Sequence, residues 1–328
     1  MIPWFEDFSV GDDFSNVPSV TITEGFAAIH QAIFGDRLKL PLDYVLNEKV
    51  TGSKRPLVNP SLVCNLAIGQ STIPSQRVMG NLFYRGLILR QPVFLGDTLT
   101  TTTQVIALRQ NKIKEGRPAS GMVALEIHTK NQNDETVLLF WRCPMIPCRD
   151  SKANTGHADD FDVMPEHIQM EDLLAAVPAW NYEPMAAKPF AISIDEKIKI
   201  EARDTVTLAP ELVRLTQNLA MTHTDAGRSV YGKRLVYGGH TISMAAAQLS
   251  RAIPDLITLL GWYHCDHTAP VFEGDVLSTS YTLLEHRPVN GANFLKLHVE
   301  VFASRGEQAP KRDDNVKVLD WELAVLTA

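Results

Sequence analysis

The octapeptide Pro-Val-Phe-Leu-Gly-Asp-Thr-Leu at residues 92–99 recurs as Pro-Val-Phe-Glu-Gly-Asp-Val-Leu at residues 270–277, an offset of 178 residues (270 − 92). The dipeptide Leu57-Val58 recurs as Leu235-Val236 at the same offset. Two matches at one spacing indicate an internal duplication, and a repeat of this kind governs how the rest of the chain is interpreted. We therefore expect two copies of one structural unit within the 328 residues.

Each copy carries the same order of predicted elements. A Thr-rich lead-in and a short helix precede a longer apolar helix, which runs from Pro60 to about Gln70 in the first copy and from Gly239 to about Arg251 in the second. Strands that alternate apolar and polar residues end each copy, for example at 123–129 and 294–301. The residues expected on the buried faces of the short helices are Phe26, Ile29 and Ile33, and then Leu212, Leu215 and Leu219.

An apolar helix wrapped by an antiparallel sheet, present twice, predicts an α+β tandem hot-dog fold. We expect residues 1–150 to form the first hot-dog unit and residues 189–328 the second. The segment 151–188, with scattered Pro, Asp and Met, is predicted to be the linker.

The densest cluster of polar residues lies in the second copy. Asn218 is expected near the end of the short helix and His223 in the loop beyond it, where functional side chains are often found. A histidine that titrates near neutrality can give or take a proton, whereas an asparagine can only hold a water by hydrogen bonds. Asp225 is a candidate for orienting the imidazole, although a hydrogen-bonded loop histidine would show the same pattern.

A second candidate feature is the run Tyr237-Gly238-Gly239-His240 at the start of the second apolar helix. Glycines there let a substrate approach free backbone N–H groups, which stabilise a developing oxyanion, but a tight turn into the helix would need the same residues. In the first copy Pro60 aligns with Gly238 and Leu62 with His240, and residues 37–56 contain no histidine. The comparison predicts catalysis in the second copy and a substrate-binding wall in the first.

These residues also carry a family resemblance. The stretch 216–225 and the run 232–240 resemble the MaoC-like acyl-CoA hydratases, and most of the chain looks like the double-hot-dog mesaconyl-CoA hydratases, also called methylmalyl-CoA dehydratases. The stretches that look like the first-half signatures of the latter are 4–8, 22–25, 96–99 and 105–111. The Gly-Asp-x-Leu element alone is common to many hot-dog proteins.

The chain departs from the broader hydratase motif Asp-x-Asn-Pro-x-His. Asn218 stands at the Asp position, Ala220 at the Asn and Met221 at the Pro, so the usual division of proton transfers between Asp and His does not carry over. In the first copy Asp36 resembles the motif's Asp, but Pro41 falls where its His should be.

The resemblance implies reversible hydration of a 2-enoyl-CoA, with mesaconyl-CoA or a close dicarboxylic analogue as substrate. The expected catalytic residues are His223, Asn218 and Gly239, and the expected substrate-binding residues are Asp225, Arg234, Tyr237, Gly238 and His240. Arg234 is the candidate for pairing with a substrate carboxylate, with Arg85 and Arg90 as alternatives. A generic (R)-specific enoyl-CoA hydratase, a hot-dog thioesterase and a non-catalytic acyl-CoA-binding protein remain as rival functions.

Composition excludes several other classes of protein. The net charge of −7 disfavours a nucleic-acid partner, and no apolar run approaches the roughly 20 residues that span a bilayer. The first residues lack a signal-peptide pattern, so we expect a cytoplasmic protein, and homo-oligomerisation stays open. The four cysteines are expected to be buried free thiols.

No cofactor or metal is expected. The run His264-Cys265-Asp266-His267 is the one stretch that suggests metal ligands, but in a strand its side chains alternate between opposite faces and do not converge on one ion.

Overall fold

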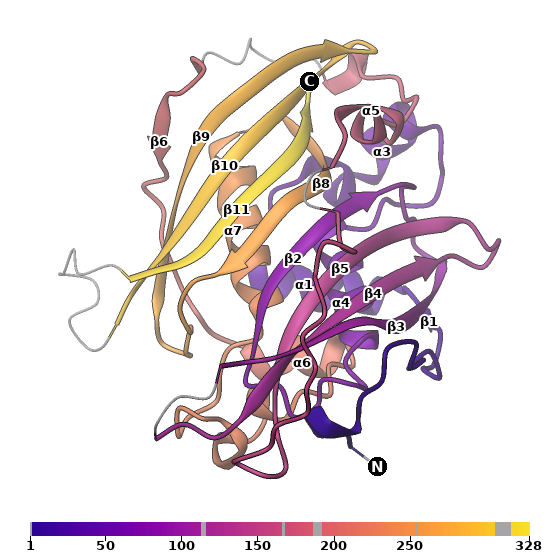
Figure 1. Cartoon of the computed structure of the whole chain (residues 1–328). Helices are drawn as coiled ribbons and strands as arrows, with labels where there is room; N and C mark the ends of the chain where they lie inside the picture. The colour runs from indigo at the N-terminus through magenta and orange to yellow at the C-terminus, as the bar shows by residue number, and fades with distance from the viewer. Residues whose placement is uncertain (1, 113–115, 166–167, 186–191, 254, 306–315) are drawn as a thin grey trace.

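The computed structural model describes residues 2–112, 116–165, 168–185, 192–253, 255–305 and 316–328. Within these ranges eleven strands form one sheet in the order β1-β3-β4-β5-β2-β8-β11-β10-β9-β6, with β7 also pairing with β9. The paired strands are antiparallel throughout, and the long helices α4 and α7 lie together behind the curved sheet (Figure 1).

The strands of the first half are β1 (Val20–Thr21), β2 (Gly80–Leu89), β3 (Thr98–Gln110), β4 (Ser120–Lys130) and β5 (Thr136–Pro147). Its helices are η1 (Phe5–Asp7), α1 (Glu24–Phe34), α2 (Lys39–Leu42), α3 (Tyr44–Thr51) and α4 (Pro60–Gln70). The connecting segment holds α5 (Met170–Ala175) and η2 (Glu183–Met185). The strands of the second half are β6 (Lys197–Lys199), β7 (Asp204–Thr205), β8 (Leu256–His267), β9 (Val276–Val289), β10 (Ala292–Ser304) and β11 (Val316–Thr327). Its helices are α6 (Ala209–Leu215), η3 (Met221–His223), η4 (Ala226–Arg228) and α7 (Gly238–Ala252).

The two halves meet where β2 pairs with β8, with Tyr84 opposite Cys265. Outward from this pair the strand order is the same on both sides, because β5, β4 and β3 follow β2 as β11, β10 and β9 follow β8. The structure thus confirms two equivalent units, each an antiparallel sheet around a long helix, fused into one continuous sheet.

The same hydrogen bonds occur within each unit, between residues related by the 178-residue offset found in the sequence. The Val58 N–H donates to the Val93 carbonyl at 2.8 Å, and the Val236 N–H donates to the Val271 carbonyl at 2.9 Å. The repeated Gly-Asp forms the same turn twice, in which the carboxylate of Asp97 or Asp275 accepts from the backbone N–H three residues earlier. Conservation of the turn between copies explains why this octapeptide is the clearest trace of the duplication.

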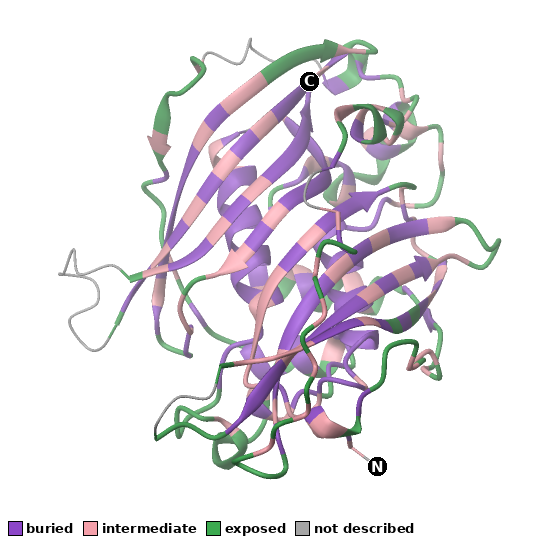
Figure 2. Ribbon diagram, in the orientation of Figure 1, coloured by how far each residue is buried: buried purple, intermediate pink, exposed green. Residues whose placement is uncertain are grey.

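The centre of the molecule is the crossing of the two long helices. Every residue of α4 is buried, and so is α7 from Gly239 to Ser250 (Figure 2). At the crossing the Asn65 Nδ2 donates to the Ser243 Oγ at 2.7 Å. These two residues are themselves 178 positions apart (243 − 65), so the approximate two-fold axis that relates the units passes close to this hydrogen bond.

Four of the six residues predicted on the buried faces of the short helices pack against the core, because Leu212 is fully buried and Phe26, Ile33 and Leu215 are partly buried. The other two residues do not. Ile29 is 47% exposed and Leu219 is 49% exposed, and α6 ends before Leu219. The most buried residues of α1 are His30 and Phe34, with the Phe34 ring 4.9 Å from the His240 ring. A polar residue therefore lies on the buried face, which a search for apolar periodicity alone does not detect.

The connecting segment packs tightly against the sheet. Leu173 is fully buried, and Val177, Tyr182 and Met185 join it in a hydrophobic cluster with residues of both halves, such as Ile88 and Leu260. Gly261 on β8 gives room for this segment, because a Cβ there would lie 2.7 Å from the Leu173 side chain. The predicted linker is therefore part of the folded body.

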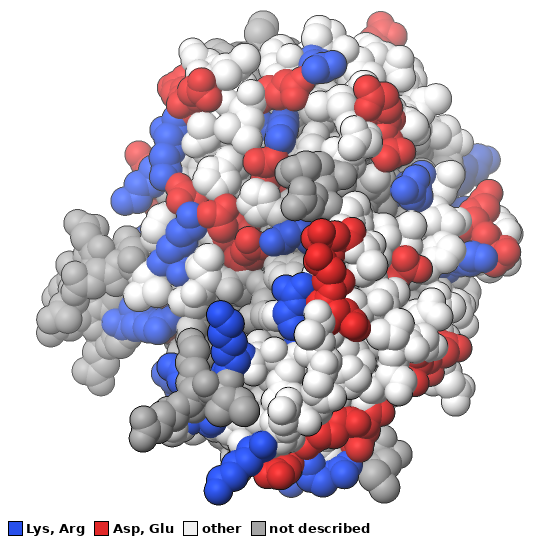
Figure 3. All heavy atoms as spheres, viewed as in Figure 1, with Lys and Arg blue, Asp and Glu red and all other residues white. Residues whose placement is uncertain are grey.

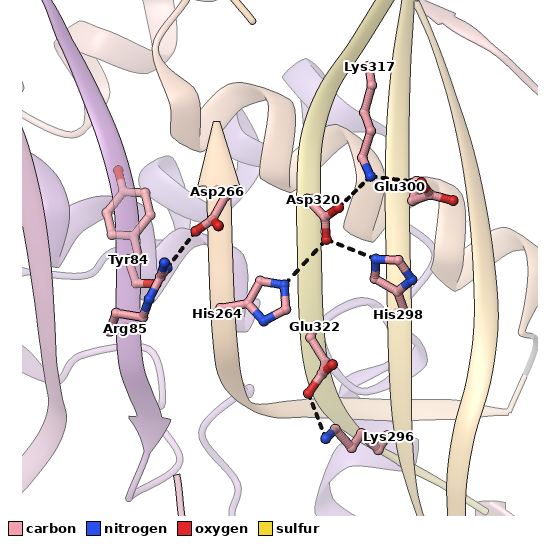
Figure 4. A network of polar contacts seen from close by, with 10 residues as sticks. All are labelled: Tyr84, Arg85, His264, Asp266, Lys296, His298, Glu300, Lys317, Asp320 and Glu322. Carbon is pink, nitrogen blue, oxygen red and sulfur yellow. Dashed lines mark hydrogen bonds and ion pairs between the residues drawn. The ribbon is translucent and has the colours of Figure 1, made fainter. Parts of the chain in front are cut away.

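The outer face of the sheet carries cross-strand ion pairs (Figure 4). Asp320 on β11 accepts hydrogen bonds from His298 at 2.8 Å and His264 at 3.3 Å and also pairs with Lys317, while Arg85 on β2 pairs with Asp266 at 2.5 Å. Acidic and basic side chains are intermixed over this face (Figure 3). None of the described helices has the length and apolar character needed to cross a membrane. All four cysteines are buried and free, as predicted.

Candidate active site

A cavity of about 210 Å³ lies between the two halves, where the loop before β2 faces the N-terminus of α7. The first half contributes side chains from the end of α4 to β2 and from β5, and the second half contributes the segment after α6, the start of α7 and the end of β8. Its polar lining residues include Thr72, Ser75, Asn81, Tyr84, Arg142, Asn218, His223, Tyr237, Thr241 and His267.

His223 lies in the short helix η3 and lines the cavity. Its Nδ1 lies 2.8 Å from the Leu235 carbonyl oxygen, which can only accept, so Nδ1 carries the proton and Nε2 keeps a free lone pair. Burial lowers the pKa of His223 to about 4. The imidazole is therefore neutral at pH 7 and can accept a proton through Nε2.

Asn218 lines the same cavity, and its Oδ1 accepts from the Ala220 N–H at 2.9 Å. Asp36 makes the same two-residue turn in the first half, where its Oδ1 accepts from the Leu38 N–H at 2.8 Å. The amide oxygen of Asn218 is thus engaged with the backbone, and the Nδ2 group remains to donate to a water or substrate oxygen. The resemblance of Asp36 to the motif's first residue reflects this equivalent position.

The start of α7 differs from the start of α4 in how its N–H groups are satisfied. Asn59 caps α4 by accepting from the Ser61 N–H at 2.8 Å, and Pro60 has no N–H. The N-cap of α7, Tyr237, makes no side-chain cap hydrogen bond, so the first N–H groups of this helix have no capping side chain. Gly238, the first residue of α7, lines the cavity and can offer its N–H to a ligand.

Both glycines permit close packing. A Cβ at Gly238 would lie 2.4 Å from the His267 ring, and one at Gly239 would lie 2.0 Å from the Asn65 Oδ1. Gly239 is buried against the helix crossing, and Gly238 is the one of the pair that lines the cavity. Tyr237 contributes its ring to the wall, 5.7 Å from the His223 ring.

Four of the residues predicted from the sequence lie outside this cavity, and the buried Gly239 is one of them. His240 is fully buried, and its Nε2 lies 2.8 Å from the Thr207 carbonyl oxygen. Asp225 is exposed and caps η4 by accepting from the Gly227 N–H, while the Leu235 carbonyl, and not Asp225, accepts from the His223 Nδ1. Arg234 is exposed and forms an ion pair with Glu273.

Sequence reasoning missed two cavity residues that carry buried polar groups. His267 ends β8, and burial lowers its pKa to about 4. The predicted split of the run 264–267 between faces is confirmed: His264 and Asp266 lie in the outer ion pairs, whereas Cys265 is fully buried and His267 reaches the cavity. The other is Arg142 on β5, which could have been found as the single charged residue in the otherwise apolar run 137–146.

The first half has an equivalent of this cavity, and it is nearly closed. Leu57, Val58, Pro60 and Val63 line a space of about 30 Å³, and each aligns at the 178-residue offset with a residue of the larger cavity. The connecting segment adds Ala176, Pro178 and Trp180 to the wall of this space, and the rest of the lining comes from residues 89–93 and 258–260. The segment therefore covers the position that is open in the second half.

Comparisons with known proteins agree with this description. No family model matches the sequence. A protein of solved structure from Mycobacterium tuberculosis, described as having a double hot-dog fold, is 38% identical, with a TM-score of 0.89 over 100% of this chain and 99% of that one. A MaoC-domain dehydratase structure from Chloroflexus aurantiacus is 26% identical, with a TM-score of 0.83 over 99% of this chain and 97% of that one. The predicted tandem hot-dog fold is thus confirmed, and the protein is a double-hot-dog protein.

Two curated relatives are similar over nearly their whole length. The β-methylmalyl-CoA dehydratase of Chloroflexus aurantiacus is 31% identical over 98% of this chain and 96% of the relative. The mesaconyl-CoA hydratase of Cereibacter sphaeroides is 27% identical over 96% of this chain and 94% of the relative. The chain belongs to the MaoC-like double-hot-dog acyl-CoA hydratases of this kind, which are hydro-lyases.

Proposed function

We propose that the chain catalyses reversible hydration of a 2-enoyl-CoA with a dicarboxylic acyl chain, converting mesaconyl-CoA to methylmalyl-CoA. The names of the two curated relatives support this substrate class. The observation that carries the proposal is His223, a neutral imidazole that is fixed through Nδ1 and lines the cavity beside an uncapped helix start.

The proposed reaction uses one proton carrier. The His223 Nε2 takes a proton from water as the water oxygen bonds to the β-carbon, and the electrons of the double bond move to the thioester oxygen. The Gly238 N–H stabilises that negative charge, and Asn218 orients the water. The imidazolium then gives its proton to the α-carbon and the thioester carbonyl re-forms. Because one group takes and returns the proton, we expect the hydroxyl and the proton to add to the same face.

In this proposal the protein's own residues supply proton transfer, positioning and electrostatic stabilisation. The β-carbon of an enoyl thioester is already electrophilic through conjugation, so water addition needs neither a redox cofactor nor a metal. Among the described residues that line the cavity there is no Asp or Glu. A thioesterase that uses a carboxylate as base or nucleophile therefore has no candidate residue at this site.

The test follows enoyl-thioester absorbance and free thiol in parallel, with mesaconyl-CoA and crotonyl-CoA as substrates. Loss of absorbance without release of thiol supports hydration, and release of thiol would indicate a thioesterase. Binding of the thioester with neither change would indicate a non-catalytic binding protein. His223→Ala should lower the hydration rate by about 10²- to 10⁴-fold while the protein stays folded. Hydration in D₂O, analysed by NMR of the product, reports the face of addition.

A further inference from the structure

Arg142 is a buried cation at the wall of the candidate active site. It lies on β5 opposite Tyr84 of β2, is 3% exposed and lines the cavity. A charged side chain is almost never buried to this degree unless it is paired. A guanidinium at this depth needs hydrogen-bond acceptors and a negative charge nearby.

The partners of Arg142 satisfy only part of the guanidinium. Its Nε donates to the Ser71 Oγ at 2.9 Å, and its Nη2 donates to the Ser71 carbonyl at 2.6 Å and the Ser75 Oγ at 2.9 Å. Ser71 is the C-cap of α4, where the helix dipole places about half a negative charge. These contacts hold the side chain in one orientation and leave the two donors of Nη1 without a partner among the described residues.

No carboxylate neutralises this cation within the described structure. Arg142 is in none of the ion pairs there, and it is the single charged residue among those described that line the cavity. Burial lowers the pKa of Arg142, although arginine stays protonated in proteins. The site thus holds an uncompensated positive charge.

The equivalent position in the second half is apolar. Tyr84 aligns with Trp262 at the 178-residue offset, and Trp262 pairs with Leu323 on β11 where Tyr84 pairs with Arg142 on β5. Pairing of these two strands therefore does not require an arginine at this position. Tyr84 and Arg142, the polar pair of the first half, both line the open cavity.

We propose that Arg142 binds the free carboxylate at the far end of the substrate's acyl chain. A carboxylate there would accept from Nη1 and supply the missing negative charge, in the kind of buried pair for which arginine is well suited. This assignment rests on the proposed function, and it replaces Arg234, which is exposed and already paired with Glu273. It specifies the substrate class as dicarboxylic monothioesters.

The first test compares turnover of two substrates by Arg142→Met. We expect kcat/KM for mesaconyl-CoA to fall about 10²- to 10³-fold, the loss typical of removing one member of a buried charge pair, and kcat/KM for crotonyl-CoA to fall less than about 10-fold. The matched control is Arg85→Met, because Arg85 lies next to Tyr84 on β2 but is paired on the outer face with Asp266. It should leave the ratio of the two substrates unchanged. Equal losses on both substrates in Arg142→Met would overturn the proposal.

The second test is independent of turnover and of the variant's folding. Calorimetry on the unmodified protein compares succinyl-CoA with butyryl-CoA, which has a methyl group in place of the second carboxylate. Tighter binding of succinyl-CoA supports the assignment, and equal binding overturns it even if enoyl-CoA hydration is observed. If the unmodified protein hydrates neither enoyl thioester, the proposed function fails, while the binding preference, and its loss in Arg142→Met, still test whether Arg142 binds a second carboxylate.

Discussion

At the scale of single residues, the proposed proton carrier is His223, and burial keeps its imidazole neutral. The carbonyl of Leu235 fixes which nitrogen of His223 holds the proton, and burial fixes the range of pH over which the other nitrogen is free. A hydratase with one base needs both conditions, because the wrong tautomer or a protonated ring cannot accept a proton from water.

The first prediction concerns the pH profile of kcat/KM. Because the pKa of His223 is lowered to about 4, its base form persists from neutral pH to well below the usual histidine pKa of 6.5. We expect kcat/KM to stay nearly constant from pH 7 to about pH 5 and to fall tenfold per pH unit below about pH 4. Initial rates taken before the protein unfolds in acid measure this fall, which we call the acid limb of the profile. Circular dichroism checks that the protein is folded. A limb near pH 6.5 would contradict the assignment.

The second prediction concerns Asn218→Asp, which introduces the residue of the broader hydratase motif. The variant should fold, because Asp36 makes the same turn at the equivalent position. A carboxylate in the cavity favours the imidazolium form, so the acid limb should move upward by about one pH unit or more. The reciprocal variant Asp36→Asn, outside the cavity, should leave the limb in place. An unchanged limb in Asn218→Asp would mean that residue 218 does not interact with His223.

The site could be predicted from the sequence only in part. The cluster of polar residues in the second copy indicated Asn218 and His223, and comparison of the copies distinguished Gly238 from Pro60 and showed no counterpart of His223 in residues 37–56. Arg142 was missed because the direction in which it points depends on the pairing of β2 with β5, whose register shifts twice. Arg234 was misplaced for a related reason: proximity to Tyr237 in sequence does not determine which side of the loop faces the cavity.

At the scale of elements, the sequence predicted the long helices well because their signals are local. α4 was predicted within its observed bounds, and α7 starts and ends one residue beyond the predicted range. The packing of the connecting segment could not be predicted, because α5 has six residues and its burial depends on a surface formed by strands of both halves. A short helix has little stability without such tertiary contacts.

The third prediction concerns this segment. Leu173→Ala removes a fully buried side chain that packs against Gly261, and it should lower the free energy of unfolding by about 2–5 kcal/mol. The substitution lies away from the larger cavity, so kcat should be unchanged at a temperature where the variant is folded. Val163→Ala, at an exposed position of the same segment, is the matched control and should change stability by less than about 0.5 kcal/mol. A fall in kcat parallel to stability would show that the segment also shapes the active cavity.

At the scale of the whole molecule, buried neutral histidines make the fold sensitive to acid. His30 and His240 are 2% and 0% exposed, and burial lowers their pKa values to about 3 and about 4. In the unfolded chain both would titrate near 6.5, so the unfolded state binds more protons than the native state below that pH. Their contribution to stability is therefore present above pH 6.5 and is lost as the pH falls toward 4.

The fourth prediction follows from this linkage. Each of these histidines should cost up to about 2 kcal/mol of stability at pH 5 relative to pH 7. His30→Phe keeps an aromatic ring beside Phe34, whose ring lies 4.8 Å from that of His30. The variant should lose up to about 2 kcal/mol less unfolding free energy than the unmodified protein between pH 7 and pH 5. Urea unfolding at pH 7, 6 and 5 measures it, with His286→Gln on the surface as control. An unaltered pH dependence in His30→Phe would show that His30 is not the acid-sensitive group.

The hydrogen bond between Asn65 and Ser243 at the helix crossing bears on the history of the molecule. In a symmetric dimer of identical subunits, a residue next to the two-fold axis meets its own counterpart, so a change at that position alters both partners at once. Here the two counterparts are different residues, one donating an amide hydrogen and the other accepting with a hydroxyl. In a single chain that contains both units, each of the two positions can differ from its counterpart. The same freedom permits one half to have an open cavity while the equivalent space in the other half is nearly closed.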